Sequence, residues 1–168
     1  MQITIIDKTV AQNGHGLHTP ARICLHTTES GDSPGGQDIL NVMNFWHNQS
    51  KGLGSQLLVS KGGIVGRYVF DKHIAWAAWG ANTGTLHIEI IGRASFTKLQ
   101  WFMRLKQLWT VADIIAYWSK KWDIPVRKDL HHGVLTHKMA SDAFGGDHWD
   151  PGPAFPLGFV LRSATKRL

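Results

Sequence analysis

The chain has 168 residues, of which 43% are hydrophobic and 18% charged, so a single globular domain is expected rather than a disordered chain. One cysteine, Cys24, excludes an internal disulfide framework, and no apolar run approaches the roughly 18 to 20 residues that cross a bilayer, so no membrane insertion is expected. The formal net charge of +6 indicates a polyanionic partner, whether nucleic acid, anionic membrane or anionic cell-wall polymer.

The first 22 residues show little hydrophobic periodicity. Ile3, Ile5 and Ile6 can form a short edge strand, and residues 13–16 are typical of a turn. The N-terminus has neither a basic start nor a long apolar centre, so we expect synthesis in the cytoplasm without a secretory signal.

Residues 21–26 predict a buried strand that ends at His26. A histidine at the end of a core strand can reach a cleft from a rigid support. Taken alone, it is more simply a core histidine whose hydrogen bonds are satisfied. His26 is therefore a candidate ligand that needs partners from elsewhere in the chain.

The next segments predict a helix, a hairpin and an aromatic stretch. Residues 37–47 have apolar side chains at helical spacing. Residues 52–68 predict a hairpin whose paired glycines allow the positive φ of a tight turn. Small residues separate Trp76 from Trp79, which predicts either a wall that stacks on a ligand or ordinary core aromatics.

Residues 86–92 predict a central strand that contains one acidic residue, Glu89. A buried carboxylate is costly unless it is paired, near a metal or facing water in a cleft. The alternative is a glutamate on the polar face of a half-exposed strand. His87 shares a face with Glu89 because strand side chains alternate, so it is a possible partner for Glu89.

A long helix is predicted over residues 98–121, with its N-cap among residues 95–97. Apolar residues three and four positions apart mark its buried face: Phe102, Leu105, Trp109, Ala112 and Ala116. We interpret this helix as scaffold and its tryptophans as core.

The stretch from His131 to Pro156 combines imidazoles and carboxylates with a Gly-Gly pair and a Pro-Gly-Pro turn that fixes the backbone beside an aspartate. Two histidines and an aspartate from separate parts of a chain can form a zinc site with one open position.

Three segments, in the same order, resemble the type 2 family of zinc-dependent N-acetylmuramoyl-L-alanine amidases, relatives of the peptidoglycan recognition proteins. They are Ile23-Cys-Leu-His-Thr-Thr28, Asn82-Thr-Gly-Thr-Leu-His-Ile-Glu-Ile90, and Gly133-Val-Leu-Thr-His137 followed by Asp150-Pro-Gly-Pro-Ala-Phe155. The resemblance runs from about Arg22 to about Pro156.

The resemblance implies one Zn²⁺ per chain, held by His26, His137 and Asp150. It also implies that Glu89 takes a proton from the attacking water and passes it to the leaving amine. His148 stands where the family often has a lysine that stabilises the oxyanion; it can donate a hydrogen bond but is not a permanent cation. His148 also competes with Asp150 as third ligand, and the following Pro-Gly-Pro favours Asp150.

One departure from the family concerns a tyrosine that, in some relatives, follows the glycine of the hairpin and assists catalysis. This chain has Gly54-Ser55 at that place, so the role of the tyrosine is absent or redistributed.

The expected fold is therefore a single α/β domain over residues 1–168, with its core at roughly 22–156. A central mixed sheet is flanked by helices, with a zinc cleft along one side. The resemblance implies hydrolysis of the amide bond between N-acetylmuramic acid and L-alanine in bacterial peptidoglycan. We expect the protein to be a monomer.

A basic chain rich in tryptophan suits contact with an anionic wall, which favours a phage endolysin, made in the host cytoplasm, over a cytoplasmic wall-recycling amidase. A peptidoglycan-binding module without catalysis stays open. A nucleic-acid binder ranks last, and no nucleic acid is expected as partner, because the basic residues are dispersed.

Overall fold

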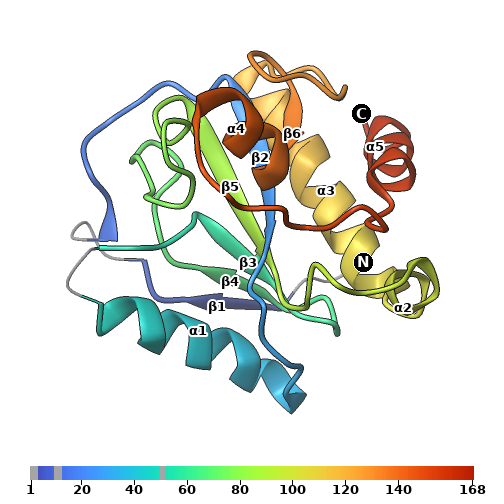
Figure 1. Ribbon diagram of the computed structural model, residues 1–168. Coiled ribbons are helices and arrows are strands. Elements are labelled where there is room, and N and C mark those ends of the chain that lie inside the picture. The colour runs from blue at the N-terminus through green and yellow to red at the C-terminus, as the bar shows by residue number, and fades with distance from the viewer. Residues whose placement is uncertain (1–3, 10–12, 50–51) are drawn as a thin grey trace.

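The computed structural model describes residues 4–9, 13–49 and 52–168 and shows one mixed sheet with helices on both faces (Figure 1). In these residues the strand order is β1-β4-β3-β5-β2-β6, and every neighbouring pair is parallel except β3 and β4. The strands are β1 (Ile5–Asp7), β2 (Arg22–Thr27), β3 (Leu57–Val59), β4 (Val65–Arg67), β5 (Thr85–Ile90) and β6 (Val134–Thr136). The predicted α/β domain with a central mixed sheet is confirmed.

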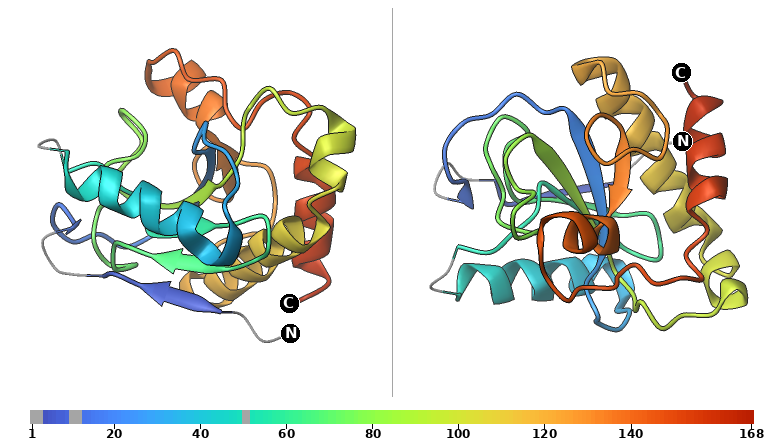
Figure 2. Two further views of the ribbon diagram at one scale, coloured as in Figure 1. Left: turned by 90° about the horizontal axis from the view of Figure 1, so that it is seen from below. Right: turned by 45° about the horizontal axis from the view of Figure 1, so that its top comes forward.

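The helices form two layers, which Figure 2 shows from two further directions. On one face, α3 and α5 pack together against the sheet, and on the other face α1 packs near β4 and α4 packs near β2 and β6. The helices are the 3-10 turn η2 (Pro34–Gly36), α1 (Gln37–His47), α2 (Lys98–Phe102), α3 (Leu105–Trp122), α4 (His137–Phe144) and α5 (Leu157–Thr165).

Alternation along β2 and β5 gives the sheet one apolar face and one partly polar face. Ile23, Leu25 and Ile88 belong to the large core beneath α3 and α5. The intervening residues point to the other face, and the parallel register pairs Cys24 with His87 and His26 with Glu89. The polar residues of two central strands thereby meet on the face that α1 and α4 cover only in part.

Several predicted boundaries are confirmed. The helix over 37–47 is α1, and the hairpin within 52–68 is β3 and β4. The N-terminal edge strand is β1, which contains Ile5 and Ile6, whereas Ile3 lies outside the described residues. The helix α1 approaches β4 so closely that a Cβ at Gly66 would collide with Ile39, and this contact fixes the helix on the sheet.

The prediction of one helix over 98–121 is wrong, because the chain breaks after α2 and restarts as α3. Arg104 has φ −118° and ψ 33°, outside the helical region, and its buried guanidinium bonds to Asp32, Gln107 and the carbonyl of Ile91. At this break the guanidinium reaches Asp32 in the loop after β2. The predicted N-cap is confirmed, because Thr97 forms a capping box with Gln100.

The predicted buried face of this region is only partly right. Leu108 and Ile115 are fully buried, as are Trp101 and Trp118, but Trp109 is 41% exposed. Trp109 is therefore a surface tryptophan rather than a core residue. In the ranges given above, no helix combines the length and apolar character needed to cross a membrane.

Candidate metal centre and cleft

Two histidines meet because they end neighbouring parallel strands. His26 is the penultimate residue of β2, and His137 follows β6 directly as the first residue of α4. Since β2 and β6 are parallel, both side chains emerge at the same edge of the sheet. Their Nδ1 atoms lie 2.9 Å apart, and both residues are buried.

Asp150 completes the group from the loop after α4. Its Oδ1 lies 3.1 Å from Nδ1 of His137, and its Oδ2 lies 3.7 Å from Nδ1 of His26. The backbone N–H of Thr27 donates to Oδ2 over 3.1 Å, which ties the aspartate to β2. Gly152, with φ +85°, lets the turn pass so close to Ala94 that a Cβ would overlap the Ala94 carbonyl.

The charges of these three groups suit a divalent cation. Burial is the main cause that lowers the pKa of His26 well below its usual value, with His137 and His87 adding to it, so His26 is neutral. Burial alone would raise the pKa of Asp150, but the hydrogen bonds from His137 and from the backbone N–H of Thr27 help to lower it on balance. The donor atoms of these two imidazoles and the carboxylate lie within 4.8 Å of one another, so the group could hold a divalent metal ion.

Glu89 lies beside this group on β5, opposite His26 in the register. Among the described residues, its Oε2 has no hydrogen-bond partner although it is buried. Burial, followed by repulsion from Asp150 and Glu29, raises the pKa of Glu89 to about 8. A carboxyl group perturbed in this way at the wall of a cavity is a candidate acid or base.

His148 is placed differently from the buried donors. Its ring stacks on His137 with centroids 3.9 Å apart and an interplanar angle of 16°. Its side chain is 58% exposed, and its Nδ1 lies 3.6 Å from Oδ1 of Asp150. This geometry favours Asp150 over His148 as the third ligand and places His148 at the wall of the cavity.

A cavity of about 1120 Å³ opens beside the donor group. Glu89, His137, His148 and Asp150 line one part of it, together with Thr27, Thr28 and Glu29. The lining also includes aromatic and apolar residues: His15, Trp46, Leu53, Ile74, Trp76 and Trp79.

Both tryptophans of the segment between β4 and β5 face this cavity. Trp76 is 44% exposed and Trp79 is 81% exposed, so neither is a core residue. His15 stacks on Trp76 with centroids 3.7 Å apart at 11°, and its Nε2 lies 2.8 Å from the carbonyl oxygen of Gly52. His15 thereby holds the Trp76 ring in place at the cavity, where the ring can contact a ligand.

Comparison with protein families identifies the chain. Residues 16–153 match the family described as N-acetylmuramoyl-L-alanine amidase. The chain belongs to this family. Curated protein sequences give no significant match.

Solved structures share the fold of this amidase family member at low sequence identity. N-acetylmuramoyl-L-alanine amidase LysC from Clostridium intestinale has a TM-score of 0.67 at 18% identity, with 98% of both chains covered. Staphylococcus aureus hydrolase AmiA, in complex with its ligand, has a TM-score of 0.72 at 14% identity, covering 99% of this chain and 86% of that one. The catalytic domain of XlyA has a TM-score of 0.71 at 16% identity, covering 96% and 99%.

The hairpin position at which some family members carry a tyrosine offers no catalytic group here. Ser55 is buried, and its hydroxyl donates to the carbonyl of Leu57 over 2.9 Å. Gly54 lines the cavity, and the ring of Tyr68 fills the space that a Cβ there would need.

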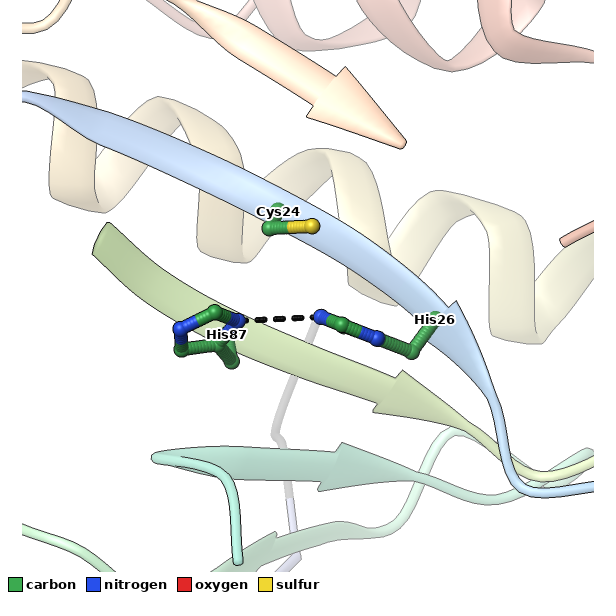
Figure 3. Close-up of side chains that lie close together, drawn as sticks. All are labelled: Cys24, His26 and His87. Atoms are coloured by element: carbon green, nitrogen blue, oxygen red, sulfur yellow. Dashed lines mark hydrogen bonds between the residues drawn. The ribbon is translucent and has the colours of Figure 1, made fainter. Parts of the chain in front are cut away.

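The sequence did not reveal what His87 contacts. It was interpreted as a possible partner of Glu89, but its Nδ1 lies 2.9 Å from Nε2 of His26 (Figure 3). Cys24, His26 and His87 form a second group of donors within 4.8 Å of one another, which shares His26 with the first. The alternation of residues on β5 gave the face of His87, but only the register against β2 gives its neighbour.

Proposed function

We propose that this chain hydrolyses the amide bond between N-acetylmuramic acid and L-alanine in peptidoglycan, with one Zn²⁺ held by His26, His137 and Asp150. The observation that supports this most strongly is the convergence of these three donor groups beside a large cavity, next to the perturbed carboxyl of Glu89. When bound, the metal supplies Lewis acidity, which polarises an amide carbonyl and lowers the pKa of water.

Glu89 is proposed as the proton carrier of the reaction. It lines the cavity, and its Oε2 has no partner in the described part of the chain, so no hydrogen bond competes for an incoming proton. The residue accepts a proton from the attacking water and delivers it to the nitrogen of the leaving L-alanine. Burial and, to a smaller extent, repulsion from Asp150 raise the pKa of Glu89; a positive charge bound at Asp150 would offset this repulsion and favour the carboxylate that the role requires.

His148 is proposed to stabilise the negative charge that develops on the carbonyl oxygen. Its ring is exposed to the cavity and held parallel to His137, so one N–H can point to a substrate. Because a neutral imidazole is a weaker stabiliser than a lysine, this contribution would depend on the hydrogen bond alone.

The tryptophan wall is proposed to bind the substrate, because Trp76 and Trp79 expose aromatic surface to the same cavity. Replacing Trp76 with alanine should raise KM about 2- to 10-fold and leave kcat nearly unchanged, since a stacking contact is worth about 0.5–1.5 kcal/mol. Steady-state kinetics on soluble wall fragments measures the two constants separately.

Trp109 provides a matched control for that substitution. It is a tryptophan of similar exposure, 41% against 44%, but it lies on α3 on the other face of the sheet. Trp109→Ala should leave KM unchanged. An equal rise of KM in both variants would show that the effect of Trp76 is not local to the cavity.

We further propose that the activity is bacteriolytic, as in a phage endolysin acting as a monomer on the cell wall. The net charge of +6 supports attraction to anionic wall polymers. Solved structures with the same fold include a mutant endolysin from Bacillus subtilis, with a TM-score of 0.70 at 17% identity.

Chelation tests the proposed reaction directly. Purified peptidoglycan treated with the protein should release new L-alanine amino termini, and a strong chelator should reduce the release to background. Added Zn²⁺ should restore it, because the three donor groups are held by the chain itself.

Two results would contradict this expectation. Full release from protein whose metal content is near zero would remove the metal from the reaction. Tight binding to walls without any release, measured by sedimentation with the same walls, would identify a binding module instead of an enzyme.

A further inference from the structure

We propose that His87 is a positioning residue that holds His26 in the tautomer whose Nδ1 offers a free lone pair to a metal. The inference about the metal rests on the proposed function, whereas the inference about the tautomer rests on the hydrogen bonds alone. His87 does not line the cavity. Of the three proposed ligands, it contacts His26 through a hydrogen bond.

The contact between the two rings is enclosed and direct. His87 is fully buried and His26 is 1% exposed. Nε2 of His26 lies 2.9 Å from Nδ1 of His87, as Figure 3 shows. The backbone N–H of His87 donates to Oε1 of Gln56 over 2.8 Å, which links β5 at this residue to the residue just before β3.

Hydrogen-bond distances connect His87, His26, His137 and Asp150 in that order, and the acceptor Asp150 determines where the protons lie. Oδ1 of Asp150 lies 3.1 Å from Nδ1 of His137, and a carboxylate oxygen accepts hydrogen bonds, so His137 carries its proton on Nδ1 and donates it. Nδ1 of His26 lies 2.9 Å from the same nitrogen, and two N–H groups cannot face each other at that distance. His26 is therefore protonated on Nε2, and Nδ1 of His87 must accept that proton's hydrogen bond.

This arrangement leaves one group unsatisfied. His87 must then carry its own proton on Nε2, and in the part of the chain that the structure describes this buried atom has no partner. A buried N–H without an acceptor costs free energy. An apolar residue at position 87 would avoid that cost, but it would leave the buried Nε2–H of His26 without an acceptor instead.

The role is consistent with a general rule for metal-binding histidines. The ring nitrogen that does not bind the metal almost always donates to an acceptor that fixes the tautomer and the ring orientation. Here that acceptor is a second imidazole instead of a carboxylate or a backbone carbonyl. The competing interpretation is that Cys24, His26 and His87 themselves hold a metal ion.

Nitrogen-15 NMR of the imidazoles tests the tautomer in the unaltered protein. In both metal-free and zinc-loaded protein, His26 should carry its proton on Nε2, and a scalar coupling should cross the hydrogen bond to Nδ1 of His87. Protonation of His26 on Nδ1 in the metal-free protein would overturn the inference, and this result does not depend on whether a variant folds or an activity is found.

Substitutions test the consequence for metal binding. His87→Leu removes the acceptor and should lower the Zn²⁺ affinity about 10- to 100-fold, measured by competition with a chelator. His87→Asn places an amide oxygen near the position of Nδ1 and should keep the affinity close to that of the parent. Parental affinity in His87→Leu, or equal loss in both variants, would overturn the role as acceptor.

Cys24→Ala distinguishes the two interpretations of the second donor group. It alters the same buried cluster without touching the His26–His87 hydrogen bond, so it should leave the Zn²⁺ affinity unchanged. A loss equal to that of His87→Leu would show that Cys24, His26 and His87 hold the metal. If the parent binds no Zn²⁺ at all, the proposed metal centre fails, while the NMR result still decides the tautomer.

Discussion

Replacing Glu89 with glutamine should lower the rate of amide hydrolysis about 10²- to 10⁴-fold while the protein keeps its fold and its zinc. Glutamine preserves the shape of the side chain but cannot take a proton from water. It also removes a carboxyl group whose pKa burial and neighbouring carboxylates raise to about 8, so the variant should be no less stable than the parent.

The measurement is the release of L-alanine amino termini from purified walls, with zinc content determined on the same samples. Glu29→Gln is the matched control, because Glu29 is another carboxylate at the same cavity. Its Oε1 accepts hydrogen bonds from Thr27 and Ala94, and glutamine can keep both bonds. Parental turnover in Glu89→Gln would refute the proposed proton transfer even if the metal site is correct.

Removing a ligand should have an effect as large, through loss of the metal. His137→Ala and Asp150→Ala should each reduce the zinc content from one per chain to near zero, because a site with two remaining protein ligands is too weak to retain the ion. Elemental analysis after gel filtration measures this directly, and wall hydrolysis should fall to background in both variants.

His148→Ala is the discriminating companion of Asp150→Ala. The exposed ring of His148 lies outside the buried group of donors, so this variant should keep its zinc and lose turnover. If His148→Ala loses zinc while Asp150→Ala retains it, the third ligand has been assigned to the wrong residue.

The sequence predicted those parts of the fold and the site that depend on local patterns. Short apolar runs placed His26 at the end of one strand and Glu89 within another, and both strands are observed. The resemblance to the family supplied the third element, the stretch from His137 to Asp150. The structure then brought His26, His137 and Asp150 within contact of one another.

What the sequence could not predict depends on contacts between distant segments. At the break between α2 and α3, Arg104 bonds to Asp32, which is 72 positions away, and helical periodicity does not predict such a long-range bond. The partner of His87 depends on the register of β5 against β2, which alternation within one strand does not specify. Trp109 has the helical spacing of a core residue, yet it lies outside the buried face of α3 and is exposed.

The cavity beside Glu89 does not end there. A second depression of about 580 Å³, between the loop after β2 and α1, shares Thr27, Thr28, Trp46 and Glu89 with the first. Its other lining residues are mostly polar, such as Ser30, Ser33 and Asn41, with Val42 and Phe45 beside them. Under the proposed function, a substrate held at Glu89 therefore has room to continue in both directions, toward Trp76 and Trp79 on one side and toward α1 on the other. A polymer can lie across such a trough at an interior position, without threading a free end into it.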